Sequence, residues 1–277
     1  MSENHLIHTA LGVELVRKLA AEGDRIFTND RARELAPAVG LSEGYLRQAL
    51  HHLATSGWIV RLRYGLYAIS STVPGMPPIH ELDVAMHLVH PAAISHWSAL
   101  HYHGLTEQIP RMIYVTTSSI SIPRLRESKT EAAKAGYPIG NLFYRFIQVK
   151  PTKFFGTEKI WCGDARITMT DPERTLLDGL AMPQLCGDFA EVLHAFETRG
   201  DKLDVERITG YALKLDAATA KRLGWLLERN GVDTARLSPL AEIPIKGYRI
   251  LDSTGPRKGP CNRRWMIQEN LPGRLLP

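Results

Sequence analysis

The hydrophobic pattern of this chain changes its period at Gly57, and this change constrains the fold more than any other feature. Ahead of it, apolar residues recur at the spacing of one helical face, and these are Leu46, Ala49, Leu50 and Leu53. Ser42 precedes them and is of a type that caps helices. After Gly57, apolar and polar residues alternate up to a turn at Tyr64 and Gly65. We expect a helix over residues 42–56 and a β-hairpin over residues 58–69.

Shorter elements precede this helix. A helical pattern over residues 7–19 ends at Gly23, and residues 25–27 form an apolar run that fits a short strand. A second helix is expected over residues 31–39, with its last turn distorted by Pro37. Two helices joined by a tight turn and followed by a hairpin are the plan of a winged helix-turn-helix, whose second helix enters the major groove of DNA.

The polar face of the 42–56 helix and the hairpin tip carry residue types that bind DNA. The candidate DNA-binding residues are Ser42, Gly44, Tyr45, Arg47, Gln48, His51, Arg61, Arg63 and Tyr64. Arg47 can donate to guanine or phosphate, and Gln48 can pair with adenine. Gly44 allows a close approach of the backbone, and the free N–H groups after Ser42 can bind a phosphate. The hairpin residues are expected to touch phosphates or the minor groove, which adds affinity without sequence information.

The charge of this region leaves a second interpretation open. The whole chain has a net charge of +5, yet residues 1–70 hold 8 Lys and Arg against 7 Asp and Glu. Winged helices also serve as protein-docking modules, and a nearly neutral module is compatible with that use. DNA binding is the preferred interpretation because the few cations lie at the expected contact points.

The rest of the chain predicts a second domain. Residues 71–80 are rich in Pro and Gly and predict a linker. We expect an α+β fold with a winged helix-turn-helix over residues 1–75 and a mixed α/β domain, with a central sheet and flanking helices, over residues 76–277. In this domain helices are expected at 79–88, 95–103, 173–182, 188–197 and onward to about 230, and strands at 112–117, 142–149, 159–162 and 165–170. Asp171, Pro172 and Glu173 form a typical helix start.

Two segments of this second domain are basic. Residues 111–166 hold 10 Lys and Arg against 4 acids, and residues 246–277 hold 7 against 2. Within the second segment, the candidate nucleic-acid patch consists of Arg257, Lys258, Arg263, Arg264 and Trp265, which are cations beside an aromatic ring. A solvated C-terminal tail is the competing interpretation.

Functions of other classes have weaker support. Closely spaced histidines could serve a metal- or ligand-responsive regulator, and these are His87, His90, His96, His101 and His103. No Cys or acidic pair completes a ligand pattern, so no metal site and no cofactor are expected. A nucleic-acid-processing enzyme could use Glu158, Asp164, Asp171 and Glu173 as a metal-binding cluster. No phosphate loop, HExxH or GxSxG motif is present, so we expect no enzyme.

Other patterns bear on where the chain works. No run of about 18 apolar residues predicts a membrane span. The N-terminus lacks the features of a secretory signal. Cys162, Cys186 and Cys261 lie far apart and fit a reducing compartment better than a disulfide framework. A cytoplasmic location is therefore expected.

Several segments resemble a known family. The runs are SGWIVRLRYGLYAI, then PAAISHWSALHYHGLTEQIPRMIYVTT, then TMTDPERTLLDGL, and the basic loop ending at Arg263, Arg264 and Trp265 is also similar. Together they resemble the AbiEi family, the antitoxins of type IV abortive-infection toxin–antitoxin systems used in phage defence. The resemblance covers residues 10–265.

The resemblance implies two activities. The winged helix would bind inverted repeats in the promoter of its own operon and act as a transcriptional repressor, as a monomer or weak dimer that binds cooperatively. The C-terminal domain would counteract a nucleotidyltransferase toxin, with no stable complex between the two proteins expected. Some members of the family occur without a toxin, in which case the chain would be a stand-alone regulator.

Overall fold

The computed structural model describes residues 3–123 and 136–271, with side chains from residue 10 onward. The chain divides into two compact units. The first comprises residues 1–89 and 162–165, and the second comprises residues 90–161 and 166–277. The expected boundary at residue 75 falls in the irregular segment ahead of the last helix of the first unit. The two units are described separately below.

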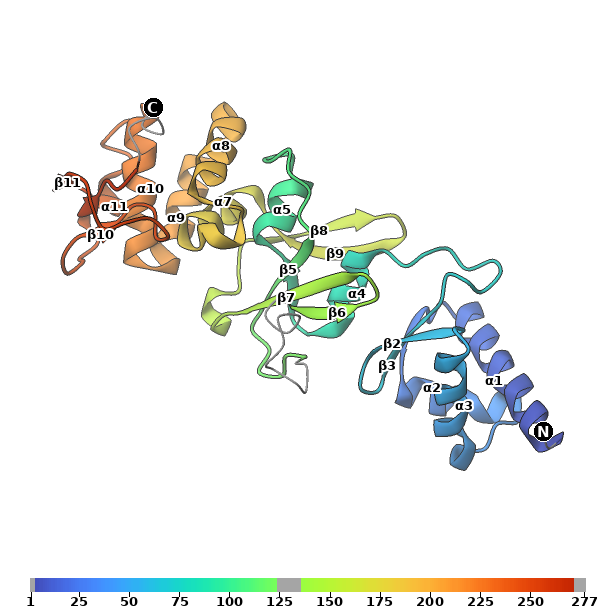
Figure 1. The fold of residues 1–277 in the computed structure, drawn as a ribbon. Coiled ribbons are helices and arrows are strands. Elements are labelled where there is room, and N and C mark those ends of the chain that lie inside the picture. The colour runs from blue at the N-terminus through green and yellow to red at the C-terminus, as the bar shows by residue number, and fades with distance from the viewer. Residues whose placement is uncertain (1–2, 124–135, 272–277) are drawn as a thin grey trace. The chain divides into compact units, whose positions relative to one another are not determined.

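The first unit follows the expected order of elements (Figure 1). Its elements are α1 (Glu3–Ala21), β1 (Ile26–Thr28), α2 (Asn29–Leu35), the 3-10 helix η1 (Ala36–Val39), α3 (Glu43–Thr55), β2 (Ile59–Arg63), β3 (Leu66–Ile69) and α4 (Glu81–Leu88). The strands form an antiparallel sheet in the order β1-β3-β2. The helix at 42–56 and the hairpin at 58–69 are thus confirmed as α3 and β2–β3.

Local chemistry explains how these helices start and end. Thr28 caps α2 by accepting a hydrogen bond from the N–H of Arg31 at 3.2 Å. Pro37 lies where α2 gives way to η1, as expected for a residue that cannot donate a helical hydrogen bond. Gly40 then ends the segment with a φ of 76°, which a glycine adopts at little cost. Ser42 occupies the N-cap position of α3, although its hydroxyl makes no capping hydrogen bond.

The strict alternation expected for residues 58–63 is wrong. Ile59 and Leu62 are buried, whereas Val60 is 41% exposed. The register of β2 against β3 shifts between Arg61 and Arg63, which marks a β-bulge. The extra residue rotates the strand, so that Leu62 turns into the core while both arginines remain exposed.

The core of the first unit lies between its helices and the hairpin. The apolar stripe of α3 is buried as expected, and it comprises Leu46, Ala49, Leu50 and Leu53. Leu15 and Leu19 of α1 are fully buried in the same cluster. A Cβ added at Gly12 would lie 3.5 Å from the Leu53 side chain, so α1 packs closely on α3. Burying one face of α3 in this way leaves its other face to solvent.

The second unit is built on a mixed six-stranded sheet. Its strands are β4 (Ala92–Ile94), β5 (Met112–Thr117), β6 (Tyr137–Ile139), β7 (Leu142–Gln148), β8 (Thr157–Cys162) and β9 (Ala165–Thr170), in the order β6-β7-β5-β4-β9-β8. β5 runs parallel to β7, and β4 runs antiparallel to β5 and parallel to β9. The expected strands are confirmed, while the short central strand β4 was not expected.

Helices complete the second unit. They are α5 (His96–Tyr102), α7 (Pro172–Ala181), α8 (Phe189–Arg199), α9 (Val205–Leu215), α10 (Ala217–Arg229) and α11 (Ser238–Glu242), with 3-10 turns η2 (Pro151–Lys153), η3 (Pro183–Leu185) and η4 (Gly200–Lys202). The helices α7, α9 and α10 contact one another (Figure 1). A small sheet in the order β10-β12-β11 follows, made of Arg249–Ile250, Ile267–Gln268 and Cys261–Asn262. The fold class is α+β, as expected.

Trp265 belongs to the core of this unit and not to its surface. Its side chain is fully buried, and its indole N–H donates to Glu228 at 2.5 Å. A Cβ at Gly224 of α10 would lie 2.0 Å from the Trp265 ring, so the ring rests directly on the helix backbone. None of the helices in the described part of the chain combines the length and hydropathy that a bilayer crossing requires.

Candidate nucleic-acid interface

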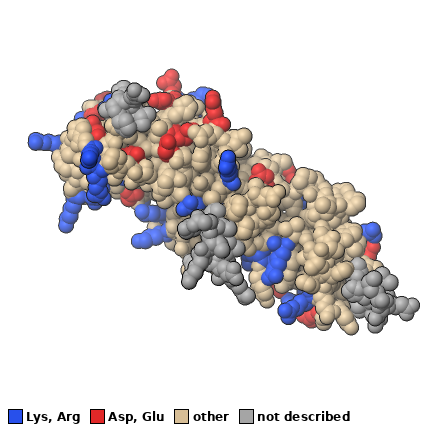
Figure 2. Space-filling view, viewed as in Figure 1, with Lys and Arg blue, Asp and Glu red and all other residues tan. Residues whose placement is uncertain are grey.

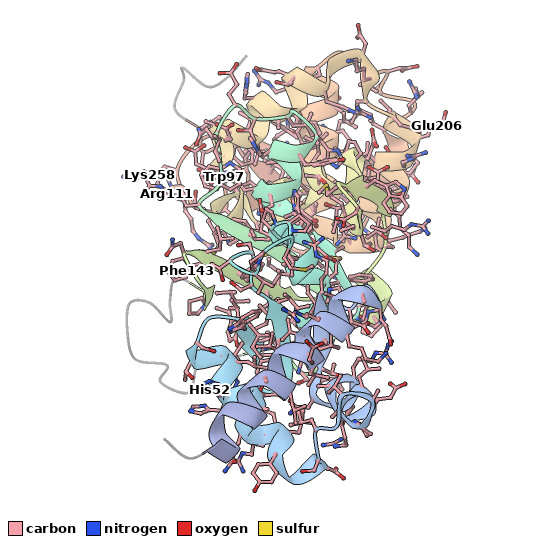
Figure 3. The ribbon with its side chains drawn as sticks, turned by 90° about the vertical axis from the view of Figure 1, so that its right-hand side faces the viewer. His52, Trp97, Arg111, Phe143, Glu206 and Lys258 are labelled. Carbon is pink, nitrogen blue, oxygen red and sulfur yellow. The ribbon has the colours of Figure 1, made fainter. Side chains whose placement is uncertain are left out.

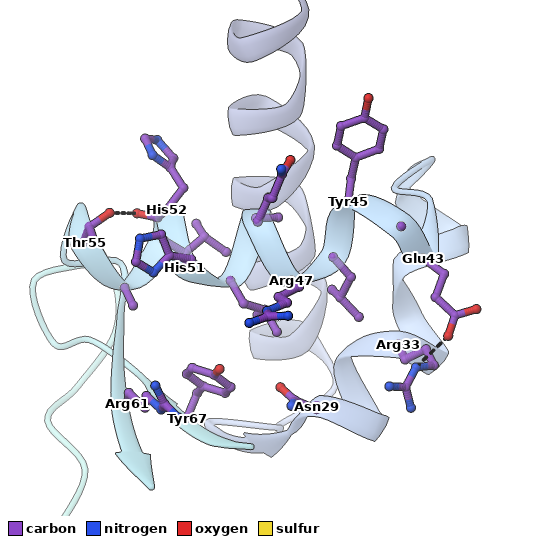
Figure 4. Close-up of a pocket in the computed structure, with 18 of the residues that line it drawn as sticks. Asn29, Arg33, Glu43, Tyr45, Arg47, His51, His52, Thr55, Arg61 and Tyr67 are labelled. Carbon is purple, nitrogen blue, oxygen red and sulfur yellow. Dashed lines mark hydrogen bonds and ion pairs between the residues drawn. The ribbon is translucent and has the colours of Figure 1, made fainter. Parts of the chain in front are cut away.

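A groove of about 1280 Å³ runs along the solvent face of α3. It is lined by α3 along its length, by Gly12 of α1, by the start of α2 and by the hairpin residues Arg61, Tyr64 and Tyr67. Figure 4 shows Glu43 and Arg33 at one end of α3 and His51, His52 and Thr55 toward the other. The groove therefore takes in the exposed face of α3, and its lining also includes the core residues Leu46, Ala49, Leu50 and Leu53.

Each of the nine residues expected to bind DNA is exposed. They are Ser42, Gly44, Tyr45, Arg47, Gln48, His51, Arg61, Arg63 and Tyr64. All except Ser42 and Arg63 line the groove. Tyr64 at the hairpin tip is 83% exposed, and the Arg61 guanidinium lies 5.6 Å from the centre of its ring. The stacking holds an arginine and a tyrosine together at the tip, where both can contact a ligand.

The arginines on this face differ from the other cations of the segment in their partners. Acidic side chains pair with five of the eight Lys and Arg of residues 1–70, namely Arg17, Lys18, Arg25, Arg31 and Arg33. Arg47, Arg61 and Arg63 form no ion pair with any side chain in the described ranges. Pairing thus neutralises much of the segment and leaves unpaired positive charge on the α3 and hairpin face.

Gly44 has open space around it. A Cβ built at this position would meet no atom within 4 Å, and its φ is an ordinary one. The fold therefore does not need a glycine here, unlike at Gly40. The hydroxyl of Ser42 makes no capping hydrogen bond, so the N–H groups at the start of α3 are open to a ligand in the groove.

Sequence reasoning missed several groove residues. Asn29, Arg33, Glu43 and Tyr67 also line it. Asn29 donates its backbone N–H to the carbonyl of Gly65 at 3.0 Å, which joins the start of α2 to the hairpin turn. Its side-chain oxygen is buried without a partner among the described groups. No local pattern could have placed Asn29, Arg33 and Tyr67 there, because α2 and the hairpin meet only in the folded unit. Glu43, in contrast, lies on the predicted helix itself.

Comparisons with known proteins show the fold. No protein-family model matches the chain, and no curated protein matches it either. Among solved structures, it is similar to the crystal structure of the RV2827C protein from Mycobacterium tuberculosis, with a TM-score of 0.66 and 15% sequence identity. The match covers 96% of this chain and 94% of that chain. The two chains share a fold over nearly their whole length.

The C-terminal cations are only partly as expected. Burial removes Trp265 from the candidate patch, and Arg264 forms an ion pair with Glu228 at 3.1 Å. Arg257, Lys258 and Arg263 are exposed. Figure 2 shows Lys and Arg side chains projecting from the surface around β10 and β11, and Figure 3 shows Lys258 at the outside of the second unit. A cationic surface is present there, but the prediction of an exposed aromatic ring beside it is wrong.

The histidines considered in the sequence analysis make different contacts and do not form one cluster of metal ligands in the described ranges. His96 is buried and its Nδ1 lies 2.9 Å from the Ser95 hydroxyl, while His103 Nε2 lies 2.8 Å from the carbonyl oxygen of Thr170. His87 contacts the backbone carbonyl of Asp83 in its own helix. In the described ranges, no group of three or more His, Cys, Asp or Glu side chains is arranged to hold a metal ion.

Two of the four acids considered for catalysis, Asp171 and Glu173, are engaged in structural contacts, while Glu158 is exposed. Asp171 caps α7 by accepting from the N–H of Arg174 at 2.8 Å, and it also accepts from the Tyr211 hydroxyl at 2.8 Å. Burial and the hydrogen bond to Asp171 raise the pKa of Tyr211 to about 12. Glu173 is buried and accepts from Arg199 at 2.9 Å. These contacts explain the DPER segment as a buried polar network that anchors α7.

Proposed function

We propose that this chain is a sequence-specific binder of double-stranded DNA, and that residues 1–75 act as a winged helix-turn-helix. In this proposal α3 is the recognition helix and the β2–β3 hairpin is the wing. The observation that carries it is the placement of Arg47, Arg61 and Arg63. These arginines lack acidic partners and gather on the exposed face of α3 and its hairpin.

In this proposal the two parts of this face have different tasks. A helix with one buried stripe and one exposed polar face fits the width of the major groove. Arg47 and Gln48 lie on that exposed face, and they can donate to guanine and pair with adenine. Arg61, Arg63 and Tyr64 extend from the hairpin, where they would contact phosphates or the minor groove. Base contacts would then come from α3, and the hairpin would supply affinity.

The biological role that we propose rests on the family resemblance in the sequence. According to this resemblance, the chain represses its own operon by binding inverted repeats, which requires two copies of the chain on the DNA. The second unit then counteracts a nucleotidyltransferase toxin without a stable complex. The exposed cations Arg257, Lys258 and Arg263 are the candidate contacts of that unit with nucleic acid. Without an adjacent toxin gene, the same DNA-binding unit would serve a stand-alone regulator.

Fluorescence anisotropy tests the DNA-binding proposal. The full chain is titrated against DNA from upstream of its own gene at about 0.15 M salt, with random DNA as competitor. Arg47→Ala should lower specific binding by about 1–3 kcal/mol. Arg17→Ala is the matched control, since it removes the same charge from an ion pair on α1 that lies outside the groove. Equal binding by both variants and the unaltered chain would contradict the assignment of α3.

A further inference from the structure

One acidic side chain stands on the face proposed to meet DNA. Glu43 is the first residue of α3, lines the groove, and has a side chain that is 76% exposed. A carboxylate there would repel the phosphate backbone of DNA, so its presence on a DNA-binding face needs a physical explanation. The inference drawn from it rests on the proposed function.

An ion pair orients the carboxylate of Glu43. Arg33 Nε lies 2.9 Å from Glu43 Oε1 (Figure 4). Arg33 Nη1 also lies 2.6 Å from Asp30 Oδ1. The three side chains together carry one net negative charge, since two carboxylates face one guanidinium. A Glu side chain that an ion pair already orients loses less conformational entropy when it binds a ligand than an unpaired one does.

The surroundings of Glu43 indicate that the group it binds is a hydrogen-bond donor. Glu43 precedes Arg47 by one helical turn, so both side chains lie along the same side of α3. If Arg47 contacts a base edge, Glu43 reaches a neighbouring base pair and not a phosphate, which it would repel. The donors on base edges in the major groove are the amino groups of cytosine and adenine, and carboxylates pair with cytosine N4.

We propose that Glu43 is a specificity-determining residue that accepts a hydrogen bond from the N4 amino group of a cytosine in the major groove. Arg33, itself paired with Asp30, is a positioning residue that orients this carboxylate. An acid in the first turn also favours the helix dipole. That role accounts for a negative charge at this position, but it does not require the contact with Arg33 of a separate helix.

The test selects preferred sites from a random DNA library with the full chain and with Glu43→Gln, and then titrates single-base variants of the selected site. The unaltered chain should prefer cytosine at one position by about tenfold. Glu43→Gln should lose that preference and favour adenine there, because an amide both donates and accepts. Arg33→Ala should weaken the preference without a change of base.

Glu34→Gln is the matched control. Its side chain is 66% exposed and pairs with Arg31 outside the groove, so the same loss of charge should leave the preference unchanged. A Glu43→Gln chain that binds every sequence more tightly with the same base preference would overturn the inference alone. A chain that selects no sequence at all would overturn the proposed function and the inference with it.

Discussion

Gly44 shows at the scale of one residue how folding and binding can be separated. Its surroundings are empty, so a methyl group would meet nothing in the fold. Gly44→Ala should therefore raise the free energy of unfolding, by up to about 1 kcal/mol, since alanine favours a helix over glycine. The same methyl group should weaken DNA binding if the backbone of α3 approaches DNA closely. Urea unfolding and anisotropy on the same protein measure both effects, and tighter or unchanged binding would contradict the close approach.

His96 makes stability depend on pH. It is fully buried with a φ of 51°, and its pKa is lowered from 6.5 by burial and by Arg174 and Arg145, against the opposing effect of Asp178. Because the unfolded chain then binds the proton more readily, the stability from neutral His96 is present above pH 6.5 and is lost as the pH falls below it.

Unfolding free energies measured from pH 8 to pH 5 should fall below pH 6.5, with a slope from this group of at most about 1.4 kcal/mol per pH unit. His96→Asn should flatten that slope, because asparagine tolerates a positive φ and does not titrate. An unchanged slope in this variant would assign the acid sensitivity to other groups.

At the scale of elements, substitutions in the hairpin and in α3 should have different effects on DNA binding. Arg63 is exposed beside the bulge of β2 and makes no ion pair in the described ranges. Arg63→Ala should weaken binding to all sequences about equally and reduce the salt slope by about 1, because a phosphate contact carries no sequence information. A loss confined to the preferred sequence would instead make Arg63 a base contact.

The packing of α10 on Trp265 gives a prediction about stability alone. A Cβ at Gly224 would overlap a ring that has no room to move, so Gly224→Ala should destabilise the chain by about 1–3 kcal/mol. Gly210→Ala in α9 is the control, because nothing lies within 4 Å of its Cβ and the helix should gain stability. Urea midpoints that fall equally for both variants would contradict the packing argument.

Elements with a clear period could be predicted, and features made by tertiary contacts could not. The buried stripe of α3 predicted its exposed face, so the exposed residues on α3 followed from spacing alone. The bulge in β2 and the three-residue strand β4 leave no such pattern. Trp265 was placed on the surface because nearby cations suggested a patch, while the glycine that seats its ring lies 41 positions earlier in the chain. The ion pairs of the cations could not be predicted from the sequence either, since Arg33 meets Glu43 only after α2 packs near α3.

At the scale of the whole molecule, the proposed function assigns separate tasks to the two units. A full-length chain with Arg47→Ala, Arg61→Ala and Arg63→Ala should lose repression of a reporter fused to its upstream DNA. The same chain should still protect cells from a toxin encoded beside it, because all three changes lie in the first unit. Loss of both activities by a chain that remains folded would show that protection depends on DNA binding.

The central claim is that α3 lies in the major groove of DNA. Protection of guanine N7 from methylation tests it most directly, because N7 is exposed only in that groove. On a sequence selected by the full chain, we predict guanines protected in two half-sites separated by a whole number of helical turns, with protection lost in Arg47→Ala. Tight binding that leaves every guanine reactive would contradict the placement of α3.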